Sequence, residues 1–272
     1  MSRLPLSVEP VSLDLAFGDV EANLGRIERA LERRLARAKG AARERLFLLP
    51  ELSLTGFVTK DPPAFRLQPP DAPVLRLSRL AARLGVGLAA GFPETDPRRP
   101  GKPFNTLALF GPDGKVVGRY RKLHLFTWGE NPEAGSYAAG DSGVVCRYRG
   151  WKVGFALCFD VRFPPLFHQY ARAGADLLLV AACWIGGPHK RYQYKTINSA
   201  HAILSQSYVA AVNRSGRDPF FRYDGAQYVF SPFGEQLYAG KPVRLDEAEL
   251  AAARRLVVRP SDLPRYPVRT AG

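Results

Sequence analysis

Short apolar runs that alternate with amphipathic segments are the feature that most limits how this chain can fold. The amphipathic or proline-started segments predict helices over 20–39, 73–84, 164–173 and 192–205. The apolar runs have the length and the bounding turn residues of buried strands, which we expect over 46–50, 86–92, 105–110, 115–121, 153–157, 176–182 and 208–213. Strands that alternate with helices indicate a layered α/β fold.

The domain organisation follows from the length and from the loops. The proline-rich stretches 61–73 and 94–103 are surface loops in this interpretation, because the strand pattern resumes after each. A chain of 272 residues with 46% hydrophobic residues can bury one substantial core. We therefore expect a single domain over residues 1–272.

Three of the predicted strands lead into a side chain that can do chemistry. Glu51, Lys122 and Cys158 each follow directly after such a run. In open α/β sheets, ligands bind beyond the carboxyl ends of the strands, so a carboxylate, an ammonium and a nucleophile would converge there. Taken singly, each residue has an ordinary alternative: a cap for Glu51, a core hydrophobe for Cys158, and a solvated basic patch with Arg119 and Arg121 for Lys122.

Taken together, these motifs resemble the nitrilase superfamily of carbon-nitrogen hydrolases. The resemblance rests on LLPELSLTGF, YRKLHLF and ALCFDVRFP, in this order and at this separation, and it extends from the helix after Asp19 to the turn at 231–235. It implies a four-layer α-β-β-α sandwich and a catalytic triad of Glu51, Lys122 and Cys158. Glu133, which stands before the aromatic and glycine of 137–140, matches the second glutamate of the family.

The implied reaction is cysteine-dependent hydrolysis of a small linear amide to a carboxylate and ammonia. A free thiol has a pKa of about 8.5, so Cys158 needs a nearby cation, Lys122, and a base, Glu51. The product of the first step would be a thioester, with the oxyanion held by Lys122 and the backbone N–H of Phe159. Glu133 would orient Lys122 or the substrate; its alternatives are a solvated loop position and a competing role for Glu130.

The substrate class is less constrained than the superfamily. The runs RGWKVGFALCFDVRFP and AVNRSG look most like omega-amidases and 2-oxoglutaramate amidases, which act on small dicarboxylate monoamides. The chain departs from such relatives at 200–206, where AHAILSQ stands in place of ARAIENQ. A nitrilase, an N-carbamoyl hydrolase and a catalytically silent binding module of the same fold remain alternatives.

Candidate pocket residues come from the motifs and the segments near them. Arg162, four residues after the cysteine, has the fork geometry that can hold a substrate carboxylate, but a salt bridge with Asp160 or another acid is the stronger expectation. Four aromatic residues are candidates for the pocket wall, and they fit the core or a dimer contact equally well: Phe126, Trp128, Trp184 and Tyr194.

Cysteine and histidine usage argues against a bound cofactor. Cys146, Cys158 and Cys183 show no disulfide framework and no CxxC spacing, and the four histidines are scattered. The chain contains no P-loop and no GxGxxG sequence. We therefore expect no metal, no nucleotide and no other cofactor.

The formal net charge of +14 raises the question of an anionic partner, but the basic residues are spread along the chain. We expect no nucleic-acid binding. No stretch reaches the roughly 20 apolar residues of a membrane span, and the first residues lack the apolar core of a secretory signal, so we expect a cytoplasmic protein without a membrane partner. The resemblance implies a homodimer or a higher homo-oligomer.

Overall fold

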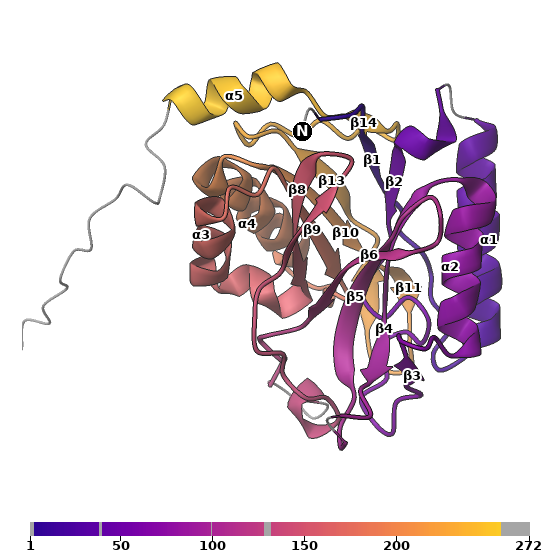
Figure 1. Ribbon diagram of the computed structural model, residues 1–272. Helices are drawn as coiled ribbons and strands as arrows, with labels where there is room; N and C mark the ends of the chain where they lie inside the picture. Colours follow the sequence, from indigo (N-terminus) through magenta and orange to yellow (C-terminus); the bar gives the residue numbers. More distant parts are fainter. Residues whose placement is uncertain (1–2, 38–39, 99, 128–131, 257–272) are drawn as a thin grey trace, which may run out of the picture.

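The computed structural model describes residues 3–37, 40–98, 100–127 and 132–256. In this part of the chain two large β-sheets stand face to face (Figure 1). The first sheet runs in the order β14 (Val243–Arg244), β1 (Ser7–Pro10), β2 (Arg45–Leu48), β4 (Gly87–Thr95), β5 (Phe104–Phe110) and β6 (Val116–Arg121), with β3 (Phe65–Arg66) paired to β4. The second runs in the order β13 (Gln227–Phe230), β10 (Tyr208–Asn213), β9 (Leu177–Ala182), β8 (Trp151–Leu157) and β7 (Val145–Tyr148).

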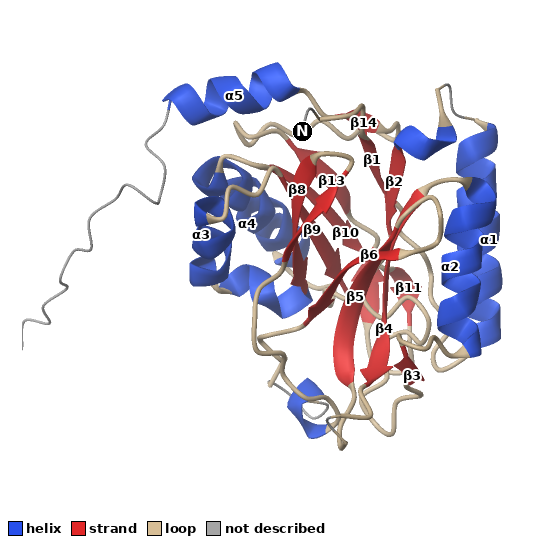
Figure 2. Cartoon of the chain, in the orientation of Figure 1, coloured by secondary structure: helices blue, strands red, loops and turns tan. Residues whose placement is uncertain are grey.

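Helices cover the outer face of each sheet, as the views in Figures 1 and 2 show. On the first sheet lie α1 (Val20–Ala36) and α2 (Ala72–Leu84), and on the second lie α3 (Pro164–Arg172) and α4 (Lys190–Ser205). A fifth helix, α5 (Glu247–Leu256), crosses one end, and β11 (Ser215–Arg217) pairs with β12 (Arg222–Asp224) in a separate hairpin. Short 3-10 turns are η1 (Ala42–Glu44), η2 (Glu133–Gly135) and η3 (Cys158–Arg162).

The core consists of three apolar layers that follow from strand alternation. In β2, Leu46 and Leu48 point into the layer between the sheets, whereas Phe47 packs with the helices outside. Successive side chains of a strand point to opposite faces, so a strand that is apolar throughout needs cover on both sides. The second sheet has its own outer layer against α3 and α4. The predicted four-layer α-β-β-α sandwich is thereby confirmed.

Helix α1 shows how local signals place an element. The side chain of Asp19 accepts a hydrogen bond from the backbone N–H of Ala22 at 2.9 Å and so caps the first turn. The residues that recur at helical spacing, Leu24, Ile27 and Leu31, are buried against the first sheet. The helix ends at Ala36, before the predicted end at residue 39.

The predicted strands and helices are present with small shifts at their ends, whereas several short elements were not predicted. Strands of two to four residues, such as β3, β7 and β14, are too short for a period to show in the sequence. They form because neighbouring strands offer backbone partners. Helix α5 was also missed, and its Leu250 joins the layer between the sheets. Among the described residues, no helix is long and apolar enough to cross a membrane.

Candidate active site

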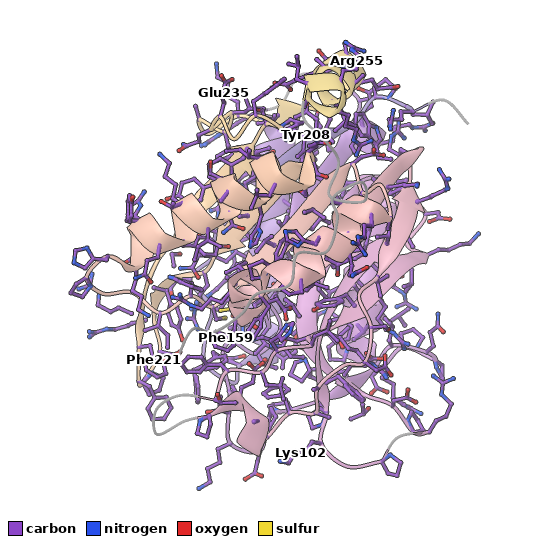
Figure 3. All side chains as sticks on the ribbon, turned by 90° about the vertical axis from the view of Figure 1, so that its left-hand side faces the viewer. Lys102, Phe159, Tyr208, Phe221, Glu235 and Arg255 are labelled. Atoms are coloured by element: carbon purple, nitrogen blue, oxygen red, sulfur yellow. The ribbon has the colours of Figure 1, made fainter. Side chains whose placement is uncertain are left out.

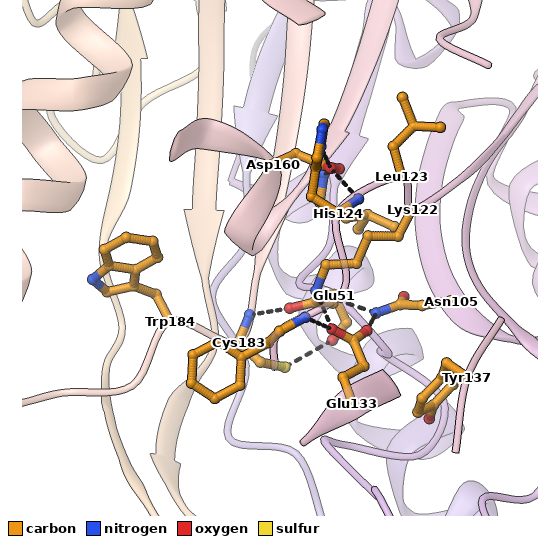
Figure 4. A network of polar contacts seen from close by, with 12 residues as sticks. Glu51, Asn105, Lys122, Leu123, His124, Glu133, Tyr137, Asp160, Cys183 and Trp184 are labelled. Carbon is orange, nitrogen blue, oxygen red and sulfur yellow. Dashed lines mark hydrogen bonds and ion pairs between the residues drawn. The ribbon is translucent and has the colours of Figure 1, made fainter. Parts of the chain in front are cut away.

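The three strand exits identified from the sequence meet at one place between the sheets. Glu51 follows β2, Lys122 follows β6, and Cys158 follows β8, so two elements of the first sheet and one of the second contribute. Cys183 joins them from the end of β9, the neighbour of β8. Figure 4 shows the polar contacts that connect the charged members of this group.

Cys158 occupies a constrained backbone position. It begins η3 with a φ of +43°, in the left-handed region that is unfavourable for a residue with a Cβ. The turn is held by the buried carboxylate of Asp160, which accepts hydrogen bonds from Leu157 N at 2.8 Å, from the hydroxyl of Tyr120 at 2.7 Å and from His124 N at 3.0 Å. These contacts tie the cysteine turn to the strand exit that carries Lys122.

Lys122 lies between two carboxylates. Its Nζ is 2.7 Å from Oε1 of Glu51 and 2.6 Å from Oε2 of Glu133, and all three side chains are fully buried. Asn105, on β5, donates from Nδ2 to the same two carboxylates at 2.8 and 2.6 Å. The backbone N–H of Cys183 donates to the remaining oxygen of Glu51 at 2.7 Å. The ammonium and both carboxylates are therefore held in one orientation.

Glu133 is an internal residue of this network, so the solvated-loop alternative is wrong. Its backbone N–H donates to Phe126 O at 2.7 Å, and its Oε2 accepts from Phe126 N at 3.0 Å. These bonds bring the start of η2 against the loop that follows Lys122. The competing residue Glu130 lies outside the described residues.

Burial sets the protonation of the group. Burial raises the pKa of Glu51, against the opposing charge of Lys122. Burial disfavours the ammonium of Lys122, but the charges of Glu133 and Glu51 outweigh it and hold its pKa well above the usual value. Burial, and then the charge of Glu51, raises the pKa of Cys158 far more than Lys122 lowers it. The resting site thus contains a cysteine thiol, a lysine ammonium and a carboxyl group of raised basicity.

A cavity of about 610 Å³ opens beside Cys158. The candidate wall residues Phe126 and Trp184 line it, and so does Phe159, which was expected only as a backbone donor. Tyr194 does not: it is fully buried, its ring centroid lies 5.4 Å from that of Trp184, and its hydroxyl donates to Val212 O at 3.1 Å. The pocket assignment of Tyr194 is corrected accordingly, and the candidate Trp128 lies outside the described residues.

Arg162 has a different partner from the one expected. Its Nη2 donates to Gln193 Oε1 at 2.9 Å, and its guanidinium carbon lies 4.8 Å from the ring centroid of Trp184. Asp160 is occupied by the contacts of the cysteine turn, and no ion pair of Arg162 occurs within the described residues. The expected salt bridge is wrong. Arg162 and Lys190, both of which line the cavity, leave positive charge facing it.

The unusual segment 200–206 supports the cysteine turn through a histidine. The ring nitrogen Nε2 of His201 lies 2.8 Å from Val161 O, in η3, and the ring stacks on Phe167 at 3.5 Å between centroids. Burial lowers the pKa of His201 from 6.5 to about 4, so the ring is neutral at pH 7 and donates to the carbonyl. Leu204, in the same segment, is exposed.

This histidine makes stability depend on pH. The pKa of His201 is lower in the folded chain than in the unfolded one, so its contribution is present above pH 6.5 and is lost as the pH falls toward 4. Between pH 7 and pH 5 we expect the free energy of unfolding to fall by about 2 kcal/mol more in the wild type than in His201→Gln, which donates without titrating. Urea unfolding at both pH values measures this. An equal loss in both proteins would refute the assignment.

Two polar residues of the site were not identified from the sequence. Asn105 donates to Glu51 and Glu133, and Asp160 accepts from Tyr120 and Leu157. The sequence feature that could have identified Asn105 is its polar amide at the start of a mostly apolar strand. For Asp160 the signal was a carboxylate that stands two residues after the cysteine and next to apolar neighbours.

The chain is similar to known proteins over most of its length. Residues 11–243 match the family model of carbon-nitrogen hydrolases. The omega-amidase NIT2 of Xenopus tropicalis is 33% identical over 211 residues, which are 74% of this chain and 72% of that protein. A hydrolase of Mycobacterium tuberculosis is 35% identical over 151 residues, 54% of this chain, and the chain spans about half, 53%, of that relative's length.

The similarity extends to a solved structure. The protein XC1258 of Xanthomonas campestris, a CN-hydrolase superfamily protein solved with an arsenic adduct in its active site, aligns with a TM-score of 0.82 at 26% identity. The alignment covers 98% of this chain and 100% of that one. Both sheets and every strand exit described above fall within it.

Proposed function

Because this chain belongs to the carbon-nitrogen hydrolase family, we propose that its site hydrolyses a small linear amide to a carboxylate and ammonia, with Cys158 as nucleophile. The observation that carries the proposal is the buried group in which Lys122 contacts both Glu51 and Glu133 beside a cysteine on a strained turn. The omega-amidase among the relatives supports an amide as substrate.

In the first half of the reaction, Sγ of Cys158 attacks the amide carbon while Glu51 accepts the thiol proton. The raised pKa of Glu51 suits this role, because a base works best when its pKa lies near the working pH. The carbonyl oxygen becomes an oxyanion, which Lys122 and the N–H of Phe159 stabilise. Glu51 then gives its proton to the nitrogen, the C–N bond breaks, and ammonia leaves a thioester on Cys158.

In the second half, water replaces ammonia. Glu51 takes a proton from the water as its oxygen attacks the thioester carbon, and the same oxyanion donors act again. Collapse of the intermediate breaks the C–S bond, releases the carboxylic acid and returns the proton to Cys158. Asn105 and Glu133 position Lys122 and Glu51 throughout, since neither can move without losing a bond of 2.6–2.8 Å.

The charges around the cavity favour an acyl group that bears a carboxylate. Arg162 and Lys190 both line the cavity beside Trp184. The guanidinium carbon of Arg162 lies 4.8 Å from the ring centroid of Trp184, and Nζ of Lys190 lies 5.7 Å from it. Within the described part of the chain, no carboxylate is among the lining residues. A substrate carboxylate would meet two cations there that have no acidic partner among the described residues, which matches an omega-amide of a dicarboxylic acid.

The first test is ammonia release from 2-oxoglutaramate, 2-oxosuccinamate, glutamine, asparagine and simple aliphatic amides. We expect Arg162→Met to lower kcat/KM for the anionic amides by about tenfold or more, because a charged hydrogen bond is lost, and to affect neutral amides less. Arg172→Met, at an exposed arginine on α3, is the matched control. Equal losses for anionic and neutral amides would remove Arg162 from substrate binding.

The same panel separates the alternative reactions. Acid formed from a nitrile would indicate a nitrilase, and carbon dioxide released with ammonia would indicate an N-carbamoyl hydrolase. We place the enzyme, as one domain, in the cytoplasm, where a reducing medium keeps the free thiols of Cys146, Cys158 and Cys183 reduced. A homo-oligomer is part of the same proposal, and light scattering of the purified chain tests it.

A further inference from the structure

The cavity has a large aromatic wall that a short acyl chain would leave mostly uncovered. Its volume of about 610 Å³ lies within the range of pockets that hold drug-sized ligands, about 300–1,000 Å³. The lining includes six aromatic side chains: Phe57, Phe126, Phe159, Trp184, Phe220 and Phe221. Pockets of this size and character bury most of the surface of ligands much larger than a simple amide.

Part of this wall comes from the hairpin β11–β12. Its tip, Pro219–Phe221, lines the cavity, and the side chain of Phe220 is 55% exposed. Phe220 contacts Phe17 edge-to-face, with centroids 5.9 Å apart, and Phe17 is itself 38% exposed. Phe221 packs against the buried cluster that includes Phe57 and Cys183. Figure 3 shows Phe159 and Phe221 in the same lower half of the molecule, with Tyr208 and Arg255 at the other end.

The hairpin tip is held rigidly although it is exposed. Oδ1 of Asp218 accepts from the backbone N–H groups of Phe220 and Phe221 at 2.9 and 2.8 Å, and its Oδ2 accepts from the hydroxyl of Tyr223 at 2.6 Å. The guanidinium of Arg214 lies 3.5 Å from Oδ2 of Asp218. An aromatic surface that is fixed before a ligand arrives loses little conformational freedom on binding.

The hairpin is also tied to the strand exit that carries Cys183 and Trp184. Gly186 N donates to Arg222 O at 2.7 Å, and Ile185 pairs with Tyr223 in an isolated bridge. Backbone contacts thereby fix the hairpin relative to the end of β9, whose Cys183 and Trp184 line the same cavity as Cys158. A ring held against Phe220 would occupy a defined position relative to the reacting carbonyl.

We infer that Phe220, with Phe221, forms a subsite for an apolar ring on the acyl part of the substrate, beyond the amide carbonyl. This inference rests on the proposed amide hydrolysis and names a substrate feature that the anionic contacts of Arg162 do not supply. The chemical class is an amide whose acyl chain carries a phenyl or cycloalkyl group, with or without a carboxylate. An exposed, preorganised aromatic corner at the mouth of a catalytic cavity is what such a group would cover.

The test compares 3-phenylpropionamide with propionamide, measured as ammonia release by the full chain. We expect kcat/KM for the phenyl substrate to exceed that for propionamide by tenfold or more. Phe220→Ala should lower this ratio by about tenfold, the effect of losing a partly buried phenyl contact. Phe220→Tyr keeps the ring and should restore most of the ratio. Phe233→Ala, at a phenylalanine 40% exposed in the turn 231–235, is the matched control.

The outcomes separate this inference from the proposed function. Hydrolysis of propionamide with no preference for the phenyl substrate, or a ratio that Phe220→Ala does not change, would overturn the aromatic subsite and leave the amidase proposal intact. Loss of the preference in Phe220→Ala but not in Phe233→Ala supports the subsite. If neither substrate nor any amide of the panel is hydrolysed, the amidase proposal itself is wrong and the subsite falls with it.

Discussion

Cys158→Ala is expected to lose at least about ten-thousandfold in kcat for every amide that the wild type hydrolyses, because removal of a catalytic nucleophile has effects on the order of 10⁴ to 10⁶. Cys183 also lines the cavity but offers no replacement. Its side chain is almost fully buried, and its thiol donates to the backbone oxygen of Glu51 at 3.2 Å. Ammonia release at saturating substrate measures the loss.

A control cysteine and a trapping experiment distinguish loss of the nucleophile from loss of the fold. Cys146→Ala removes a thiol on β7, outside the cavity lining, and should retain activity. A haloacetamide should alkylate Cys158 faster than Cys146 if Glu51, the proposed base, accepts the thiol proton. Mass spectrometry of the peptides reports the site. Full turnover by Cys158→Ala, or alkylation that spares Cys158, would end the nucleophile assignment.

Lys122→Met is expected to damage both stability and activity. The substitution leaves the buried carboxylates of Glu51 and Glu133 without their shared cation, and breaking a buried pair in this way costs about 3–5 kcal/mol. It also removes the proposed oxyanion donor, and loss of such a donor typically lowers kcat by about 10²–10³-fold. Urea unfolding and ammonia release on the same preparation measure the two effects.

A second substitution separates the two roles of the lysine. Lys122→Met combined with Glu133→Gln removes one of the stranded charges, so part of the lost stability should return. Activity should not return, because the double variant still lacks the proposed oxyanion donor. Recovery of activity in the double variant would show that Lys122 acts only by neutralising Glu133. Unchanged stability in Lys122→Met would contradict the buried contacts described above.

The architecture could be predicted from the sequence where elements are long enough to show a period. Leu24, Ile27 and Leu31 mark one face of α1 whatever the helix packs against, and apolar runs such as 208–213 mark strands covered on both faces. Strands of two residues, such as β3 and β14, have no such signature. Strand β14 forms through pairing with β1, more than 230 residues away in the chain, and only the fold supplies that partner.

The candidate site divides in the same way. Residues at the ends of strands are visible in the sequence, because strand ends are local features and carboxyl ends gather at one edge. The contacts of Asn105, Asp160 and Arg162 depend instead on which side chains the fold brings near them from other elements. An ion pair between Asp160 and Arg162 was one expectation. Instead, Asp160, which follows β8 of the second sheet, accepts a hydrogen bond from Tyr120 on β6 of the first sheet. Competition among partners that are distant in sequence cannot be settled from spacing.

What the sequence by itself determined is the order of strands and helices and the positions of Glu51, Lys122 and Cys158 at strand exits. The tertiary structure alone decided their chemistry. The pKa directions of these groups arise from burial and from charges within a few ångströms, and both exist only after the two sheets have packed face to face. The position of Phe220 at the cavity has the same origin, since it contacts Phe17, which lies 203 positions earlier in the chain.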